Sequence, residues 1–148
     1  MNKKFVQIIG YAFILLFVYT ALSKWFTYNI YLYDLRRSPD LGRFALPISL
    51  LVPGLELLAA GLLLFDKTLR KGLWFSFVLM LIFTAYVAYV LIYASDLPCT
   101  CGGIIRQLSW PQHLIFNIFF TMLAAVGLHL TKKEPSNENN QFRSFARQ

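Results

Sequence analysis

Four long apolar runs dominate this sequence and leave few ways for the chain to fold. They cover approximately residues 5–22, 45–65, 73–93 and 111–130. Each approaches the roughly 20 residues that a helix needs to cross the hydrocarbon core of a bilayer. Inside lipid every backbone polar group needs an internal partner, so the runs are expected to be helices. The sequence predicts an all-α integral membrane bundle of four transmembrane helices.

The composition agrees with a lipid environment. Of the 148 residues, 57% are hydrophobic and only 14% are charged, whereas a soluble domain carries about 25% charged residues. The first run is longer than the apolar core of a signal peptide, about 7–15 residues, so we expect it to be retained as a span. We assign residues 1–131 to the four-span domain. Residues 132–148 are polar and are expected to form a disordered cytoplasmic tail.

The net charge of +7 comes from short clusters of lysine and arginine between the apolar runs. No basic face or nucleic-acid-binding motif accompanies them, which argues against a nucleic-acid partner. The excess of cations is typical of cytoplasmic loops and predicts that both termini lie in the cytoplasm. We expect the membrane to be the inner membrane of a bacterium. In this orientation nine cations lie inside (Lys3, Lys4, Lys67, Arg70, Lys71, Lys132, Lys133, Arg143, Arg147) and five outside (Lys24, Arg36, Arg37, Arg43, Arg106).

The segment between the first two spans has a helical pattern of its own. Trp25, Tyr28, Leu32 and Leu35 recur at helical spacing, which predicts an amphipathic helix lying at the outer membrane interface. Two roles remain open for it: a plain cap over the bundle, or a lid or docking surface for a partner.

The third span ends in three tyrosines, Tyr86, Tyr89 and Tyr93. They rise toward the predicted outer surface at near-helical spacing. An aromatic belt at the level of the lipid headgroups explains most of this pattern.

Both cysteines of the chain, Cys99 and Cys101, lie in the short polar loop before the fourth span. The predicted orientation places this loop in the periplasm, where disulfides form and persist. Any intramolecular disulfide must join these two residues, and a strained, exposed disulfide is of the labile kind. Arg106 and the positive end of the fourth helix, marked by the capping-box spacing of Ser109 and Gln112, are expected to favour the reactive thiolate.

Three interpretations of the cysteine pair remain open. The pair can be redox-active, structural or incidental, or part of a metal site with His113. Two sulfurs and one imidazole suit Cu(I) or an open zinc site. No fourth protein ligand is evident, so we assign no metal ligands.

Two sets of polar residues lie within the spans. Glu56 stands near the middle of the second span, where a carboxylate indicates either a functional site or a buried network with a tyrosine or Lys24. His113, Asn117 and Thr121 recur every four residues and share one face of the fourth helix. That face is expected to line a proton path or a quinone head-group pocket, or to form hydrogen bonds between helices.

The chain resembles the MauE/DoxX-type family of redox-associated membrane proteins over residues 5–130. The resemblance rests on the four spans, the cysteine pair in the last outer loop and two short motifs, Ser23-Lys24 and Pro53-x-x-Glu56-Leu57. It implies that Cys99 and Cys101 are the redox pair and that Lys24 and Glu56 are the shared polar residues of the membrane domain.

Members of this family with such loops are thought to support disulfide formation in, or electron delivery to, extracytoplasmic proteins, often beside thioredoxin-like partners. MauE itself is implicated in maturing the disulfide-rich small subunit of methylamine dehydrogenase. The resemblance therefore implies a membrane protein that acts in the maturation of envelope proteins.

We expect the protein to exchange disulfides or electrons with a thioredoxin-like or disulfide-containing extracytoplasmic partner through Cys99 and Cys101, tuned by Arg106. If the protein is an enzyme, it is a thiol–disulfide oxidoreductase. No covalently bound cofactor is expected; a quinone near Glu56, His113 and Asn117 is the candidate electron carrier. Two other functions remain open: a non-catalytic subunit that scaffolds an envelope complex, and a Cu(I)-handling membrane protein.

Overall fold

The computed structural model describes residues 2–38, 41–93 and 109–132, and these residues contain helices and turns but no strand. In chain order the elements are α1 (Asn2–Phe26), α2 (Tyr28–Arg37), the 3₁₀ helix η1 (Gly42–Phe44), α3 (Ala45–Leu64), α4 (Leu69–Tyr93) and α5 (Trp110–Lys132). Four of these, α1, α3, α4 and α5, are long and apolar enough to cross a membrane. The predicted all-α, four-span architecture is confirmed.

The long helices extend beyond several of the predicted spans. α1 runs on to Phe26 and α4 begins at Leu69, because the polar residues at these ends find partners. In the turn between α3 and α4, the Thr68 hydroxyl donates a hydrogen bond to the carbonyl of Leu62 (2.7 Å), and the Gly72 N–H donates to the carbonyl of Thr68 (2.8 Å). These bonds satisfy backbone groups that a helix end leaves without partners. Of the predicted tail, only Lys132 lies within the described residues, as the last residue of α5.

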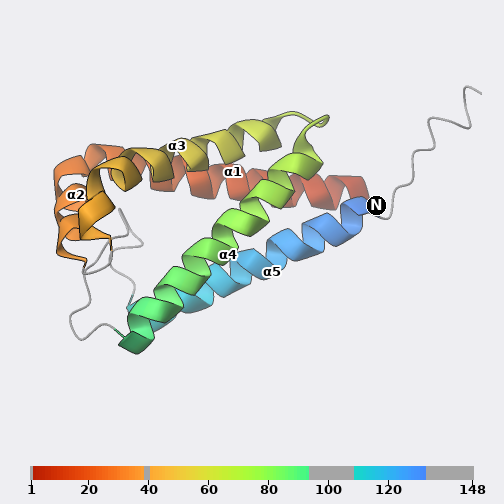
Figure 1. Cartoon of the computed structure of the whole chain (residues 1–148). Helices are drawn as coiled ribbons and strands as arrows, with labels where there is room; N and C mark the ends of the chain where they lie inside the picture. The colour runs from red at the N-terminus through yellow and green to blue at the C-terminus, as the bar shows by residue number, and fades with distance from the viewer. Residues whose placement is uncertain (1, 39–40, 94–108, 133–148) are drawn as a thin grey trace, which may run out of the picture.

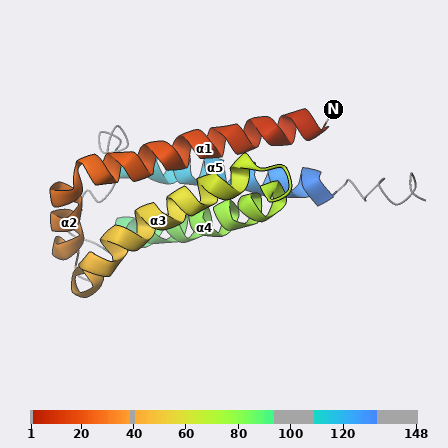
Figure 2. The same ribbon diagram turned by 90° about the horizontal axis from the view of Figure 1, so that it is seen from above.

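The four long helices pack as two antiparallel pairs, α1 with α3 and α4 with α5 (Figure 1). The short helix α2 lies across one end of the bundle, where α4 ends and α5 begins (Figures 1 and 2). We call this end the α2 end. The start of α1, the turn between α3 and α4 and the end of α5 lie at the other end, which we call the opposite end.

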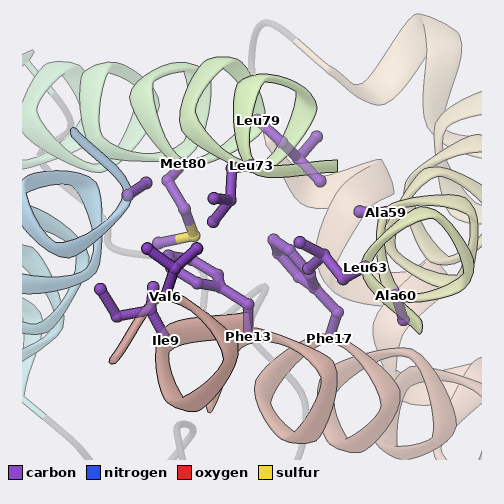
Figure 3. Packing of buried hydrophobic residues seen from close by; sticks show 11 residues of the cluster. Val6, Ile9, Phe13, Phe17, Ala59, Ala60, Leu63, Leu73, Leu79 and Met80 are labelled. Atoms are coloured by element: carbon purple, nitrogen blue, oxygen red, sulfur yellow. The ribbon is translucent and has the colours of Figure 1, made fainter. Parts of the chain in front are cut away.

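The apolar core fills the half of the bundle near the opposite end. Phe13 and Phe17 project from α1 toward Leu73 and Met80 of α4 and Leu63 of α3 (Figure 3). The Phe13 ring also meets the Phe120 ring of α5 edge to face, with centroids 5.3 Å apart. All four long helices therefore share one core, which holds the two pairs together.

Small side chains occupy most of the buried positions of α3. These positions are Ala45, Ser49, Pro53, Glu56, Ala59, Ala60 and Leu63. Small residues at a helix interface let two backbones come together, and this increases van der Waals contact between membrane helices. Glu56 is the exception in this row, the only charged side chain among them.

The predicted helix between the first two spans is present as α2. Of the residues predicted to share a face, Leu32 and Leu35 pack against α3, whereas Trp25 does not. Tyr31 and Leu35 are buried and pack with Ala45 at the start of α3. Trp25, expected on this face, belongs to α1 and is 61% exposed. A break in the helix at Thr27 changes the register between the two segments. The location of α2 at a membrane surface stays a prediction.

Gly42 controls how the chain turns from α2 into η1, and replacing it should displace α2. A Cβ atom at Gly42 would lie 2.7 Å from the backbone oxygen of Arg36. We expect Gly42→Ala to lower the free energy of unfolding by about 1–3 kcal/mol, the usual cost of overpacking, measured by denaturation in detergent micelles. Gly61→Ala is the matched control, since nothing lies within 4 Å of its Cβ position. Equal stability of the two variants would contradict this account.

Candidate functional site

A buried ion pair joins α1 to α3. Lys24 Nζ lies 2.7 Å from Glu56 Oε1, and the two residues are only 8% and 1% exposed. Charges removed from water are tolerated only when they are well paired, and this distance is that of a direct, charge-assisted hydrogen bond. The sequence left a tyrosine or Lys24 open as the partner of Glu56, and the partner in the structure is Lys24. Lys24, counted from the sequence among the outer cations, lies in the last turn of α1 with its side chain inside the bundle.

The ion pair borders a cavity of about 240 Å³ in the half of the bundle near the α2 end. All five α-helices contribute to its walls. Its polar lining consists of Thr20, Lys24, Tyr31, Glu56, Tyr86, His113 and Asn117. The remaining lining is apolar, with Phe17, Val52 and Met80 among its members. The cavity is thus a mostly apolar chamber to which every α-helix contributes at least one polar side chain.

The three residues predicted to share a face of α5 have two different roles. His113 and Asn117 are buried and line the cavity, with His113 close enough to Lys24 to interact with its charge. The Thr121 hydroxyl donates to the carbonyl of Asn117 (2.7 Å) and lies 3.1 Å from the Thr84 hydroxyl of α4. The shared face is confirmed. Thr121 joins α5 to α4 through its contact with Thr84, whereas His113 and Asn117 belong to the cavity.

The start of α5 sets the position of that face. The backbone N–H of Ser109 donates to Oε1 of Gln112 (3.0 Å), and the N–H of His113 donates to the carbonyl of Ser109 (2.9 Å). The first bond is one half of the capping box that the sequence predicts. Because α5 begins at Trp110, His113 lies in its first turn, at the α2 end of the bundle.

Two buried polar atoms of the site have no hydrogen-bond partner among the described residues: Oε2 of Glu56 and Nδ2 of Asn117. A carboxylate oxygen accepts hydrogen bonds, whereas an amide nitrogen donates them. Buried polar groups in proteins nearly always have a partner. The cavity therefore presents one unsatisfied acceptor and one unsatisfied donor.

Part of the site could not be located from sequence spacing. Tyr31 and Leu35 of α2 line the cavity, as does Tyr86 of α4. The Tyr86 hydroxyl lies 3.4 Å from the Ser38 hydroxyl that follows α2. The interpretation of Tyr86 as part of an aromatic belt was wrong, because helix rotation turns it into the bundle. Tyr93, one end of the same row, is exposed as expected.

The predicted redox residues Cys99, Cys101 and Arg106 lie outside the described residues. The structure does place the two ends of the segment that carries them. α4 ends at Tyr93 and α5 begins at Trp110, both at the α2 end (Figure 1). The cavity and the ends of the cysteine-bearing segment thus belong to the same end of the bundle.

The ion pair should show strong energetic coupling between its two members. Lys24→Met leaves the Glu56 carboxylate buried without a countercharge and should cost about 3–5 kcal/mol of stability. Glu56→Leu leaves the Lys24 ammonium buried without a countercharge and should lower the stability in the same way. The Lys24→Met/Glu56→Leu double variant should be more stable than either single variant, because both charges are gone. Denaturation in detergent of the four proteins measures the coupling; additive effects would rule out a direct pair.

Comparison with known protein families places this geometry in context. The family model described as methylamine utilisation protein MauE matches residues 2–130, which include every described helix except the last two residues of α5. Comparisons with curated proteins and with solved structures each found no match. The matched region contains the four apolar helices, the ion pair and the cavity, and it identifies a multi-pass membrane protein. This chain belongs to the MauE family.

Proposed function

We propose that this protein exchanges disulfides with extracytoplasmic proteins through Cys99 and Cys101. The observation that carries the proposal is a buried, charged site at the α2 end, the end at which the cysteine-bearing segment leaves and re-enters the bundle. Buried charge in a membrane domain is costly and marks functional sites. Membership of the MauE family supports the same conclusion.

The proposed reaction is thiol–disulfide exchange. A thiolate of the partner attacks one sulfur of the Cys99–Cys101 disulfide, which forms a mixed disulfide and releases the other cysteine as a thiolate. The second thiolate of the partner then resolves the mixed disulfide. The partner loses two electrons and gains a disulfide, while the cysteine pair becomes a dithiol. The same steps in reverse reduce a partner disulfide. Arg106 favours the thiolate form of the pair.

The partner in this proposal is a thioredoxin-like or disulfide-containing protein of the periplasm. Both termini lie in the cytoplasm of a bacterium, and the cysteine loop faces outward. The distribution of cations supports this orientation: with Lys24 inside the bundle, four of the five outer cations remain, against nine on the cytoplasmic side. An excess of lysine and arginine is typical of cytoplasmic loops.

Exchange predicts that single cysteine variants trap a partner. In Cys99→Ser or Cys101→Ser, the remaining thiolate can attack a partner disulfide, but the second cysteine that would resolve the mixed disulfide is missing. The mixed disulfide should therefore accumulate in cells and run as a larger band on non-reducing gels. The band should disappear with a thiol reductant. The Cys99→Ser/Cys101→Ser double variant is the control and should trap nothing. Failure of both single variants to capture a partner would refute exchange, in favour of a scaffolding or Cu(I)-handling role.

The proposed orientation predicts that Cys99 and Cys101 react with membrane-impermeant reagents from outside the cell. After mild reduction, a charged maleimide added to cells with a permeabilised outer membrane should label the wild-type protein. The control is Lys67→Cys in the double-serine background. Lys67 lies in the turn between α3 and α4 at the opposite end, so this variant should react only after lysis. Labelling in the reverse pattern would show the opposite topology.

A further inference from the structure

The two unsatisfied atoms of the cavity describe the ligand that would complement it. Glu56 Oε2 needs a hydrogen-bond donor, and Asn117 Nδ2 needs an acceptor. Both residues are nearly fully buried, at 1% and 4% exposure, and both line the cavity. Leaving such groups unpaired costs about 1–3 kcal/mol each. A complementary ligand therefore offers a hydrogen-bond donor to Glu56 and an acceptor to Asn117.

The charge of the site favours a neutral ligand. The Lys24 ammonium is already neutralised by the Glu56 carboxylate at 2.7 Å. No second carboxylate and no second lysine or arginine is present among the described lining residues. A phosphate or carboxylate head group would bring an uncompensated charge into this chamber, which is strongly unfavourable in a low-dielectric interior.

The size and lining of the cavity suit a six-membered ring. At about 240 Å³ it is larger than an engineered apolar cavity of about 150 Å³ that binds benzene. Phe17, Val52 and Met80 supply apolar walls, and the Phe116 ring of α5 lines the cavity beside Asn117. Such walls are typical of sites in which a few polar groups fix the orientation of a mostly apolar ligand.

One wall of the cavity is formed by a residue that also faces the outside of the helix bundle. Ile82 of α4 lines the cavity, yet it is 57% exposed. In a membrane-spanning helix, an exposed isoleucine contacts lipid. A ligand dissolved in the bilayer can enter past this residue, and its apolar tail can remain among the lipid chains. The ligand is therefore lipid-soluble.

The hydrogen-bonding groups, the charge, the size and the lipid-facing wall of the cavity together lead to one ligand. We propose that the cavity binds the ring of a membrane quinone. A quinone carbonyl oxygen accepts a hydrogen bond from Asn117 Nδ2, and a quinol hydroxyl donates to Glu56 Oε2. The two unsatisfied atoms thus match the oxidised and the reduced forms of one neutral, lipid-soluble ring.

The choice of a quinone over another hydroxyl-bearing lipid rests on the proposed function. Exchange leaves the Cys99–Cys101 pair as a dithiol, which must lose two electrons and two protons to become a disulfide again. A quinone accepts two electrons and two protons and becomes a quinol, so the balance closes. The cavity lies at the end of the bundle where the cysteine-bearing segment begins and ends.

The test uses the full-length protein in lipid nanodiscs and a photoreactive azidoquinone. Labelled peptides, identified by mass spectrometry, should come from the walls of the cavity on α3, α4 or α5. Decylubiquinone should compete for labelling, whereas decylbenzene, which has the same tail and a ring without oxygens, should not. Labelling spread along the lipid-facing surfaces, or equal competition by decylbenzene, would overturn the proposal.

Variants make the test specific for the two polar atoms. Asn117→Leu preserves the side-chain volume and should weaken competition by decylubiquinone about five- to tenfold, the effect of one lost hydrogen bond. Thr121→Val, one turn further along the same face and outside the cavity lining, should leave the competition unchanged. Unchanged competition in a folded Asn117→Leu protein would overturn the proposed contact, with folding checked by size-exclusion chromatography.

The cysteine double variant separates this inference from the proposed function. Cys99→Ser/Cys101→Ser cannot exchange disulfides, yet it should bind the quinone as the wild-type protein does. Quinone binding together with failed trapping would refute exchange and leave the site standing. Successful trapping without quinone binding would refute the site and leave exchange standing.

Discussion

The ion pair between Lys24 and Glu56 is the interaction on which the arrangement of this bundle depends. It joins α1 to α3 at 2.7 Å in a region that otherwise contains apolar and small side chains. Two charges in such surroundings are stable only together, because each removes most of the cost of burying the other. The pair therefore fixes the register of α1 against α3. It also places the two charged side chains of the cavity lining beside each other.

The two halves of the bundle differ in their interiors: one is filled by apolar side chains, and the other contains the cavity. Toward the opposite end, aromatic and aliphatic side chains such as Phe13, Phe17 and Leu73 fill the interior (Figure 3). Toward the α2 end, the pair α1–α3 and the pair α4–α5 diverge (Figure 1), and α2 closes the space with Tyr31 and Leu35. The packed half supplies rigidity, and the other half holds a chamber with hydrogen-bonding groups. A site built on rigid elements keeps its geometry better than one built on loops alone.

Much of this fold follows from the sequence, because four apolar runs of span length allow little else. The common face of His113, Asn117 and Thr121 also follows from their spacing, since residues four apart share a helix face. The spacing of residues in the first span also indicated that Lys24 points into the bundle. Phe13, Phe17 and Lys24 lie on one buried stripe of α1, but a lysine next to Trp25 resembles an interfacial anchor.

Other parts of the site depend on tertiary contacts that no local pattern encodes. The break at Thr27 changes the rotation of α2 relative to α1, so Tyr31 is buried beside Leu35 while Trp25, at the end of α1, is exposed. The rotation of α4 decides that Tyr86 lines the cavity while Tyr93 is exposed. The unsatisfied atoms of Glu56 and Asn117 emerge only when three helices are placed together. Sequence spacing locates polar residues in a span, but helix packing decides which of them meet.

The position of the ion pair in the chain has a consequence for biogenesis. Its two members are 32 residues apart, on the first and second of the four long helices. A lysine at the centre of a helix costs about 2.5–3.5 kcal/mol on insertion into a bilayer, whereas Lys24 lies in the last turn of α1, where its long side chain can extend to the interface. Since Glu56 arrives with the very next span, the two charges can neutralise each other as soon as the first hairpin has been synthesised. The ion pair can therefore form before α4 and α5 have been synthesised.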